Sequence, residues 1–127
     1  MLLGEDENLS TQIQNILTDY SSQLFTSIIA INELIQLVRI GKIKSKKYKK
    51  TIEFINTIEF DLKIKIVAFT NKNLETLANL TIADGHNDPF DHAIISQAIS
   101  DKITLISSDT KFKHYVSQKL KFVFNRR

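Results

Sequence analysis

The stretch NDPFDHAIISQAISDKITLISSD, residues 87–109, decides the fold. Asp88 directly precedes Pro89, an order typical of a helix N-cap followed by proline in the first turn. Together with the apolar residues that follow, it predicts a helix over residues 89–100. The β-favouring run at residues 103–107 then predicts a strand, and an acidic residue follows that strand closely. The stretch is therefore a helix followed by a strand. Acidic side chains lie where this helix begins and just past the end of the strand.

The same alternation of helices and strands extends outward in both directions. The apolar spacing predicts further helices over residues 11–20 (capped by Ser10), 29–40 (closed by Gly41), 48–60, 73–80 and 110–115. Further strands are predicted over residues 24–28, 63–70 and 120–124. Strands that alternate with helices indicate an α/β fold with a mainly parallel sheet. At this length we expect a single domain over residues 1–127.

The composition excludes several classes of protein. The chain has 127 residues, 17 basic and 14 acidic residues and no cysteine. It therefore has no disulfide scaffold, no thiolate zinc site and no cysteine nucleophile. No apolar run approaches the ~20 residues that cross a bilayer, and the start MLLGEDENLS does not follow the pattern of a signal peptide. We expect a cytoplasmic protein with no membrane partner.

Three acidic residues are predicted to lie at one edge of the sheet. Glu33 lies early in the second predicted helix, Asp91 in the first turn of the helix after Pro89, and Asp109 just past a strand. Carboxylates that converge without cysteine favour Mg²⁺ or Mn²⁺, which can activate a water molecule for phosphodiester hydrolysis. Each also has a simpler interpretation. Asp91 could complement the helix N-terminus, Asp109 could be an N-cap, and Glu33 could be a solvated helix residue.

Basic and histidine side chains provide weaker signals. The lysine-rich run includes four candidates for phosphate contacts with RNA, Lys42, Lys44, Lys46 and Lys47, although a solvated helix start explains them equally well. A second basic region, at Lys111, Lys113, Lys119, Lys121, Arg126 and Arg127, is expected to be surface. His86, His92 and His114 show no zinc spacing, and we expect His86 and His92 on the surface beside the acidic loop.

Three segments resemble a known family, the PIN-domain proteins, as found in the VapC-type toxin ribonucleases of bacterial toxin–antitoxin pairs. Residues 25–43 are similar to the family's second strand and helix, residues 87–98 to its DPFD helix, and residues 105–112 to its strand-then-acid motif. The resemblance implies a three-layer α/β/α fold. It also implies a Mg²⁺- or Mn²⁺-dependent endoribonuclease that acts on RNA and is held inactive by a cognate antitoxin protein. The chain could also form a homodimer.

The resemblance also assigns roles to particular residues. It makes Glu33, Asp91 and Asp109 the catalytic and metal-binding acids, and Ser107 a supporting hydroxyl at a position where Thr or Ser is usual. Asp88 is a secondary candidate, for which the cap role is favoured.

The start of the chain departs from the family pattern. The family begins with a central strand that carries an LDT-type motif, whereas residues 1–6 resemble the segment that follows that strand. We therefore expect the first strand and its Asp to be missing. The start codon could be wrongly assigned or the sequence truncated, the chain could be a divergent member without nuclease activity, or a partner chain could lend a strand. The alternative function is a catalytically inactive PIN-like module that binds RNA or a partner protein.

Overall fold

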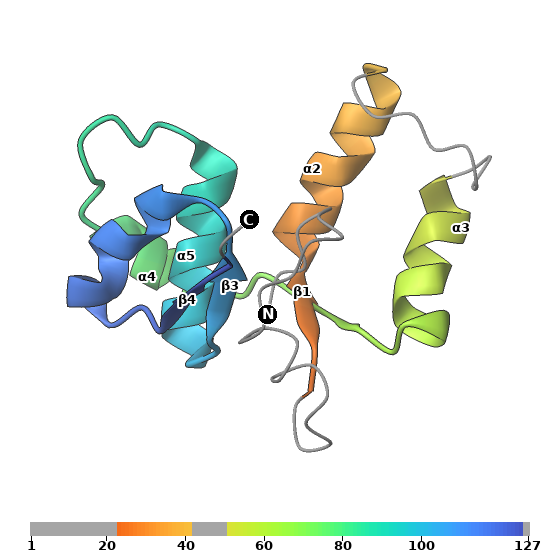
Figure 1. Cartoon of the computed structure of the whole chain (residues 1–127). Helices are drawn as coiled ribbons and strands as arrows, with labels where there is room; N and C mark the ends of the chain where they lie inside the picture. Colours follow the sequence, from red (N-terminus) through yellow and green to blue (C-terminus); the bar gives the residue numbers. More distant parts are fainter. Residues whose placement is uncertain (1–22, 42–50, 126–127) are drawn as a thin grey trace.

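The computed structural model describes residues 23–41 and 51–125, in which strands and helices alternate as predicted (Figure 1). The elements are β1 (Phe25–Ser27), α2 (Ile28–Arg39), α3 (Thr51–Asn56), the π-helical turn η1 (Thr57–Asp61), β2 (Lys65–Val67), α4 (Asn71–Asn79), α5 (Pro89–Asp101), β3 (Leu105–Ser107), the 3-10 helix η2 (Thr110–Gln118) and β4 (Phe122–Phe124). Each described strand has three residues and is shorter than predicted. The predicted helix over residues 11–20 lies outside the described residues.

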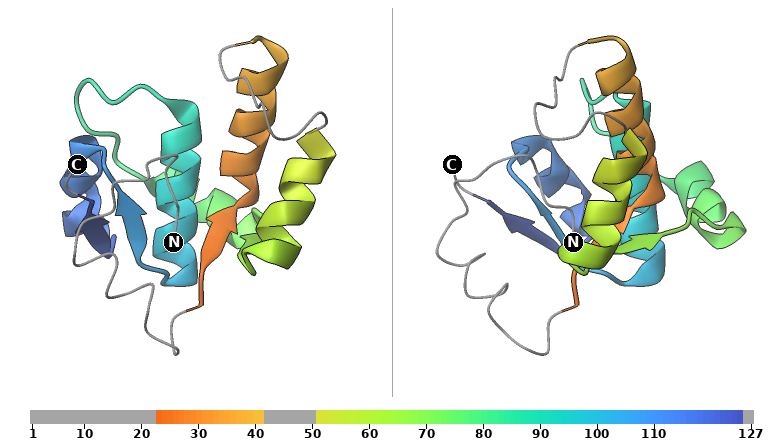
Figure 2. Two further views of the ribbon diagram at one scale, coloured as in Figure 1. Left: turned by 45° about the vertical axis from the view of Figure 1, so that its right-hand side comes forward. Right: turned by 90° about the vertical axis from the view of Figure 1, so that its right-hand side faces the viewer.

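The strands are parallel, as predicted, but within the described residues they form two separate sheets. β1 pairs with β2, with Phe25 opposite Lys65, and β3 pairs with β4, with Leu105 opposite Phe122. Figure 2 shows β1 and β3 running in the same direction. The expected α/β fold with mainly parallel strands is therefore confirmed, and the described strands form two half-sheets. Their carboxyl ends lie at the same edge of the molecule.

The helix starts follow from local capping chemistry. The Ser27 hydroxyl accepts a hydrogen bond from the Ile29 N–H at 3.0 Å, and this bond begins α2 directly after β1. The end of α2 is followed by Gly41 at φ 77°, a left-handed conformation that glycine adopts without strain. α4 begins with a capping box between Thr70 and Asn73, which the sequence analysis did not identify.

Each half-sheet has its own hydrophobic core. The larger core contains buried residues from α5, β3 and η2 and from the link between η2 and β4: Ile94, Ile95, Ala98, Leu105, Phe112, Tyr115 and Leu120. The smaller core contains Ile31, Ile58 and Ile64. α2 packs against α5 and joins the two halves. Residues 93–98 of α5 are all buried, which identifies α5 as the central helix of the fold.

No helix within the described residues is both long and apolar enough to cross a membrane.

Candidate functional site

The carboxyl edge of the strands contains a pocket of about 510 Å³. Glu33 from α2, Asp91 from the first turn of α5, and Ser107 and Asp109 at the end of β3 all line it. The structure therefore brings the three predicted acids and the predicted hydroxyl to one place. They converge because the strands are parallel. The carboxyl ends of parallel strands, and the helices that begin next to those ends, lie at the same edge.

The pocket has a donor set of the right chemistry for a hard cation, but its geometry is open. Carboxylate and hydroxyl oxygens are the ligands that Mg²⁺ and Mn²⁺ prefer. Among the residues that the structure describes, however, no three His, Asp or Glu side chains lie close enough to hold a metal ion. The donor chemistry of Glu33, Asp91 and Asp109 fits a divalent cation, whereas their spacing does not form a closed coordination set.

Asp91 is a partly buried carboxylate with a shifted pKa. Its side chain is 21% exposed, and its Oδ2 lies 3.0 Å from Nε2 of His86. Burial raises the pKa of Asp91 above its ordinary value, and the hydrogen bond from His86 opposes part of that rise. The negative charges of Asp88 and Asp109 raise the pKa further. Asp91 therefore lies among other carboxylates, as the sequence analysis expected.

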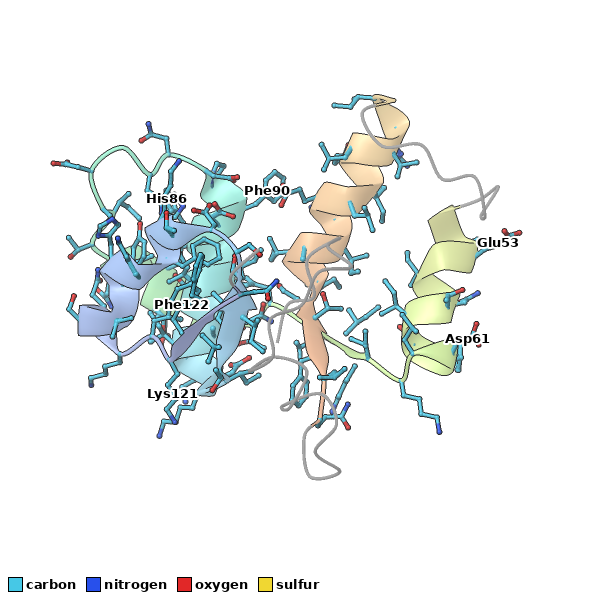
Figure 3. The ribbon with its side chains drawn as sticks, in the orientation of Figure 1. Glu53, Asp61, His86, Phe90, Lys121 and Phe122 are labelled. Atoms are coloured by element: carbon cyan, nitrogen blue, oxygen red, sulfur yellow. The ribbon has the colours of Figure 1, made fainter. Side chains whose placement is uncertain are left out.

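His86 is buried, so the expectation that it lies on the surface is wrong. Only 2% of its side chain is exposed, and both ring nitrogens have polar partners: Nδ1 lies 2.7 Å from the Tyr115 hydroxyl, and Nε2 contacts Asp91. In Figure 3 His86 lies beside η2 and the first turn of α5. The loop before α5 folds back onto η2, which removes His86 from solvent. The one sequence signal for this contact is the short separation of five positions between His86 and Asp91.

Two further acidic candidates, Asp88 and Asp109, are helix N-caps. Oδ1 of Asp88 accepts a hydrogen bond from the Phe90 N–H at 2.9 Å, so the favoured cap role is confirmed. Oδ1 of Asp109 accepts one from the Lys111 N–H at 2.9 Å, so Asp109 both caps η2 and lines the pocket. The Ser107 hydroxyl accepts a hydrogen bond from the Asp109 N–H at 3.1 Å and fixes the backbone there.

Gln97 is a buried polar residue that the sequence analysis missed. Its Oε1 accepts a hydrogen bond from the Ser27 hydroxyl. Its Nε2 donates to the carbonyls of Val67 and Ala68, at 3.2 and 2.9 Å. Gln97 thus ties the carboxyl ends of β1 and β2 to α5, and so fixes the start of α2, from which Glu33 projects. Its place between the apolar residues Ile94, Ile95, Ala98 and Ile99 of α5 was the available signal.

The structure describes some of the basic side chains considered for RNA binding but not others. Lys42, Lys44, Lys46 and Lys47 lie outside the described residues, so their proposed RNA contacts stay predictions. In the second basic region, Lys111, Lys113, Lys119 and Lys121 are exposed, as expected.

Comparisons with known proteins agree with this architecture. The family model described as PIN domain matches residues 1–117. Among solved structures, the chain is similar to one described as the crystal structure of VapBC2 from Rickettsia felis bound to a DNA fragment from their promoter. The TM-score is 0.63 at 19% sequence identity, and the match covers 91% of this chain and 83% of that chain. No curated protein matches the sequence.

Proposed function

This chain belongs to the PIN-domain family, and from that premise we propose that it is a metal-dependent endoribonuclease, the toxin component of a toxin–antitoxin pair. The observation that carries the proposal is the pocket at the carboxyl edge, which Glu33, Asp91, Asp109 and Ser107 line together. Like charges gathered in a partly buried pocket repel one another unless a cation lies among them. The donor chemistry of this pocket fits Mg²⁺ or Mn²⁺.

The residues of the pocket have distinct parts in this proposal. Glu33, Asp91 and Asp109 would hold the cation. When bound, such an ion supplies an activated water molecule and neutralises charge on the phosphoryl group. Ser107 supports the site indirectly, because its hydroxyl holds the backbone of Asp109. Asp88 stabilises the first turn of α5, which positions Asp91.

The proposed partners are an RNA substrate and a cognate antitoxin protein. The antitoxin is supported by the structural similarity to VapBC2, which is described as bound to a promoter DNA fragment. Contacts with RNA phosphates through the lysines of residues 42–47, a homodimer and a cytoplasmic location also stay proposals.

Calorimetric titration with Mn²⁺ tests the site. We expect Asp91→Asn to weaken Mn²⁺ binding, because the substitution removes a charged ligand from the pocket. Asp84→Asn is the matched control, since Asp84 is an exposed residue of the loop before α5. We expect it to bind Mn²⁺ as the unsubstituted chain does. An Asp91→Asn titration that matches the unsubstituted chain would contradict the assignment.

One observation favours the alternative, a PIN-domain module that binds RNA or a partner protein without cutting. Within the described residues, the acids do not form a set of three that is close enough to hold a metal. A nuclease assay with added Mg²⁺ or Mn²⁺ distinguishes the two functions when it is run on this chain and on a longer version that begins upstream of Met1. Cleavage by either version supports the nuclease. If neither version cleaves RNA but the chain binds RNA or a partner protein, the result supports the binding module.

A further inference from the structure

A chain of hydrogen bonds leads from the backbone through Tyr115 and His86 to the pocket. The Ala83 N–H donates to the Tyr115 hydroxyl oxygen at 3.1 Å. That hydroxyl lies 2.7 Å from Nδ1 of His86, and Nε2 of the same ring lies 3.0 Å from Oδ2 of Asp91. Tyr115 has no exposed surface and His86 is 2% exposed, so the bond between them is shielded from water, whereas the bond to Asp91 is partly buried.

The chemistry of the groups fixes the direction of this chain. A backbone N–H can only donate, so the Tyr115 oxygen accepts from Ala83. The Tyr115 proton needs an acceptor in this buried place, and Nδ1 of His86 supplies one. Nδ1 is then unprotonated, the ring proton lies on Nε2, and Nε2 donates to the carboxylate of Asp91. Each donor therefore meets an acceptor in a single order from backbone to carboxylate.

Neighbouring groups hold the His86 ring in this orientation. Nε2 of His92 lies 2.6 Å from the His86 carbonyl oxygen, and the two rings meet edge to face with centroids 4.9 Å apart. The Phe112 ring packs against the His86 ring, with the two ring centroids 5.9 Å apart. The ring is thus fixed by contacts from α5 and η2 as well as by its own two hydrogen bonds.

We propose that His86 is a positioning residue for Asp91, and that Tyr115 fixes the tautomer in which His86 donates to the carboxylate. The inference rests on the proposed function, since a fixed Asp91 matters to a cation in the pocket. A donor of known direction holds one carboxylate oxygen in place and so sets the orientation of the whole group in the pocket. Partners of this kind around metal-binding carboxylates contribute about 10- to 100-fold to metal affinity.

The first measurement needs no metal. Nuclear magnetic resonance of the imidazole nitrogens reports which nitrogen of His86 carries the proton. We expect the proton on Nε2 in the unsubstituted chain, and a mixture of tautomers in Tyr115→Phe, which lacks the hydroxyl. A proton on Nδ1 in the unsubstituted chain would overturn the inference.

The second measurement is Mn²⁺ affinity in folded variants. We expect His86→Leu to bind Mn²⁺ about 10- to 100-fold more weakly. We expect His86→Gln to recover much of that loss, because its amide nitrogen can donate near the position of Nε2. His114→Gln is the matched control, since His114 is an exposed histidine on η2, and its affinity should be unchanged. A folded His86→Leu chain with unchanged Mn²⁺ affinity would overturn the inference.

The two measurements separate this inference from the proposed function. If His86→Leu does not fold, Tyr115→Phe takes its place, because it keeps the His86 ring and removes only the hydroxyl. Weaker Mn²⁺ binding by folded Tyr115→Phe then supports the inference, and unchanged binding overturns it. If the unsubstituted chain binds no Mn²⁺, the proposed function fails, while the tautomer of His86 still decides whether the hydrogen-bond chain has the proposed direction.

Discussion

At the scale of single residues, capping and pocket formation use the same side chains. Asp109 is the N-cap of η2 and also lines the pocket, and Asp91 lies one turn into α5 beside the cap Asp88. The two interpretations of Asp109 that the sequence left open are therefore compatible. They coincide because a parallel arrangement places helix starts and strand ends at the same edge, where a carboxylate can serve a backbone N–H and a ligand at once.

The raised pKa of Asp91 predicts a pH dependence of stability. Burial raises this pKa in the folded chain, so the folded state binds the proton more readily than the unfolded state does. The free energy of unfolding should then rise as the pH falls through the raised pKa toward the ordinary value of 3.8. Above the raised pKa, this contribution is lost. Urea unfolding at a series of pH values, in the absence of metal, measures the effect.

Asp91→Asn provides the comparison for that series. Asparagine does not titrate, so the difference in unfolding free energy between the two chains should change across the window between the raised pKa and 3.8. A difference that stays constant over the whole window would show that Asp91 titrates with the same pKa in the folded and unfolded states.

At the scale of elements, the strands are short because their neighbours end them. β1 passes directly into α2, since Ser27 is both its last residue and the cap of the helix. Within the described residues β2 pairs with β1 alone, so its ladder ends at Val67 although the apolar pattern continues to Phe69. The predicted strand over residues 63–70 was therefore too long, because a strand extends only as far as its partner does.

Gln97 tests how far α5 organises these elements. We expect Gln97→Ala to lower the free energy of unfolding by about 1–3 kcal/mol, because it removes the partner of the buried Ser27 hydroxyl and of the Val67 and Ala68 carbonyls, whose hydrogen bonds are partly buried. Gln118→Ala is the matched control. Gln118 also bonds to backbone, donating to the Thr81 carbonyl at 2.8 Å and accepting from its N–H at 2.9 Å, but in a more exposed setting. Thermal or urea unfolding compares the two.

Water can replace the partners of Gln118, so its substitution should have the smaller effect. Equal losses in the two variants would mean that the buried hydrogen bonds of Gln97 do not hold the elements together more strongly than surface bonds do.

At the scale of the whole molecule, the described chain consists of two packed halves. The facing edges of β1 and β3, with α5 between them, line a narrow, mostly apolar cavity of about 30 Å³. Within the described residues, no strand pairs with both edges.

The unequal cores predict unequal local stability. Among the described residues, the half that contains Ile95 and Tyr115, both without exposed surface, has the larger core. The core of the half around Ile31 has three buried members there. We expect backbone amides of α5 and β3 to exchange hydrogen more slowly than those of β1 and β2. Hydrogen exchange measured by nuclear magnetic resonance or mass spectrometry checks this. Uniform protection would show instead that both halves unfold as a single cooperative unit.

The sequence by itself determined the alternation of helices and strands, their parallel direction, the caps at Asp88 and Gly41, and the convergence of Glu33, Asp91 and Asp109 on one edge. These features depend on local spacing and on chain connectivity, which a sequence carries directly. Only the tertiary structure showed the two half-sheets, the true strand lengths, the buried cross-link of Gln97, and the contact from His86 to Asp91. Those features depend on which segments meet in space. A loop histidine is exposed or buried according to whether η2 packs over it, and no local pattern specifies that packing.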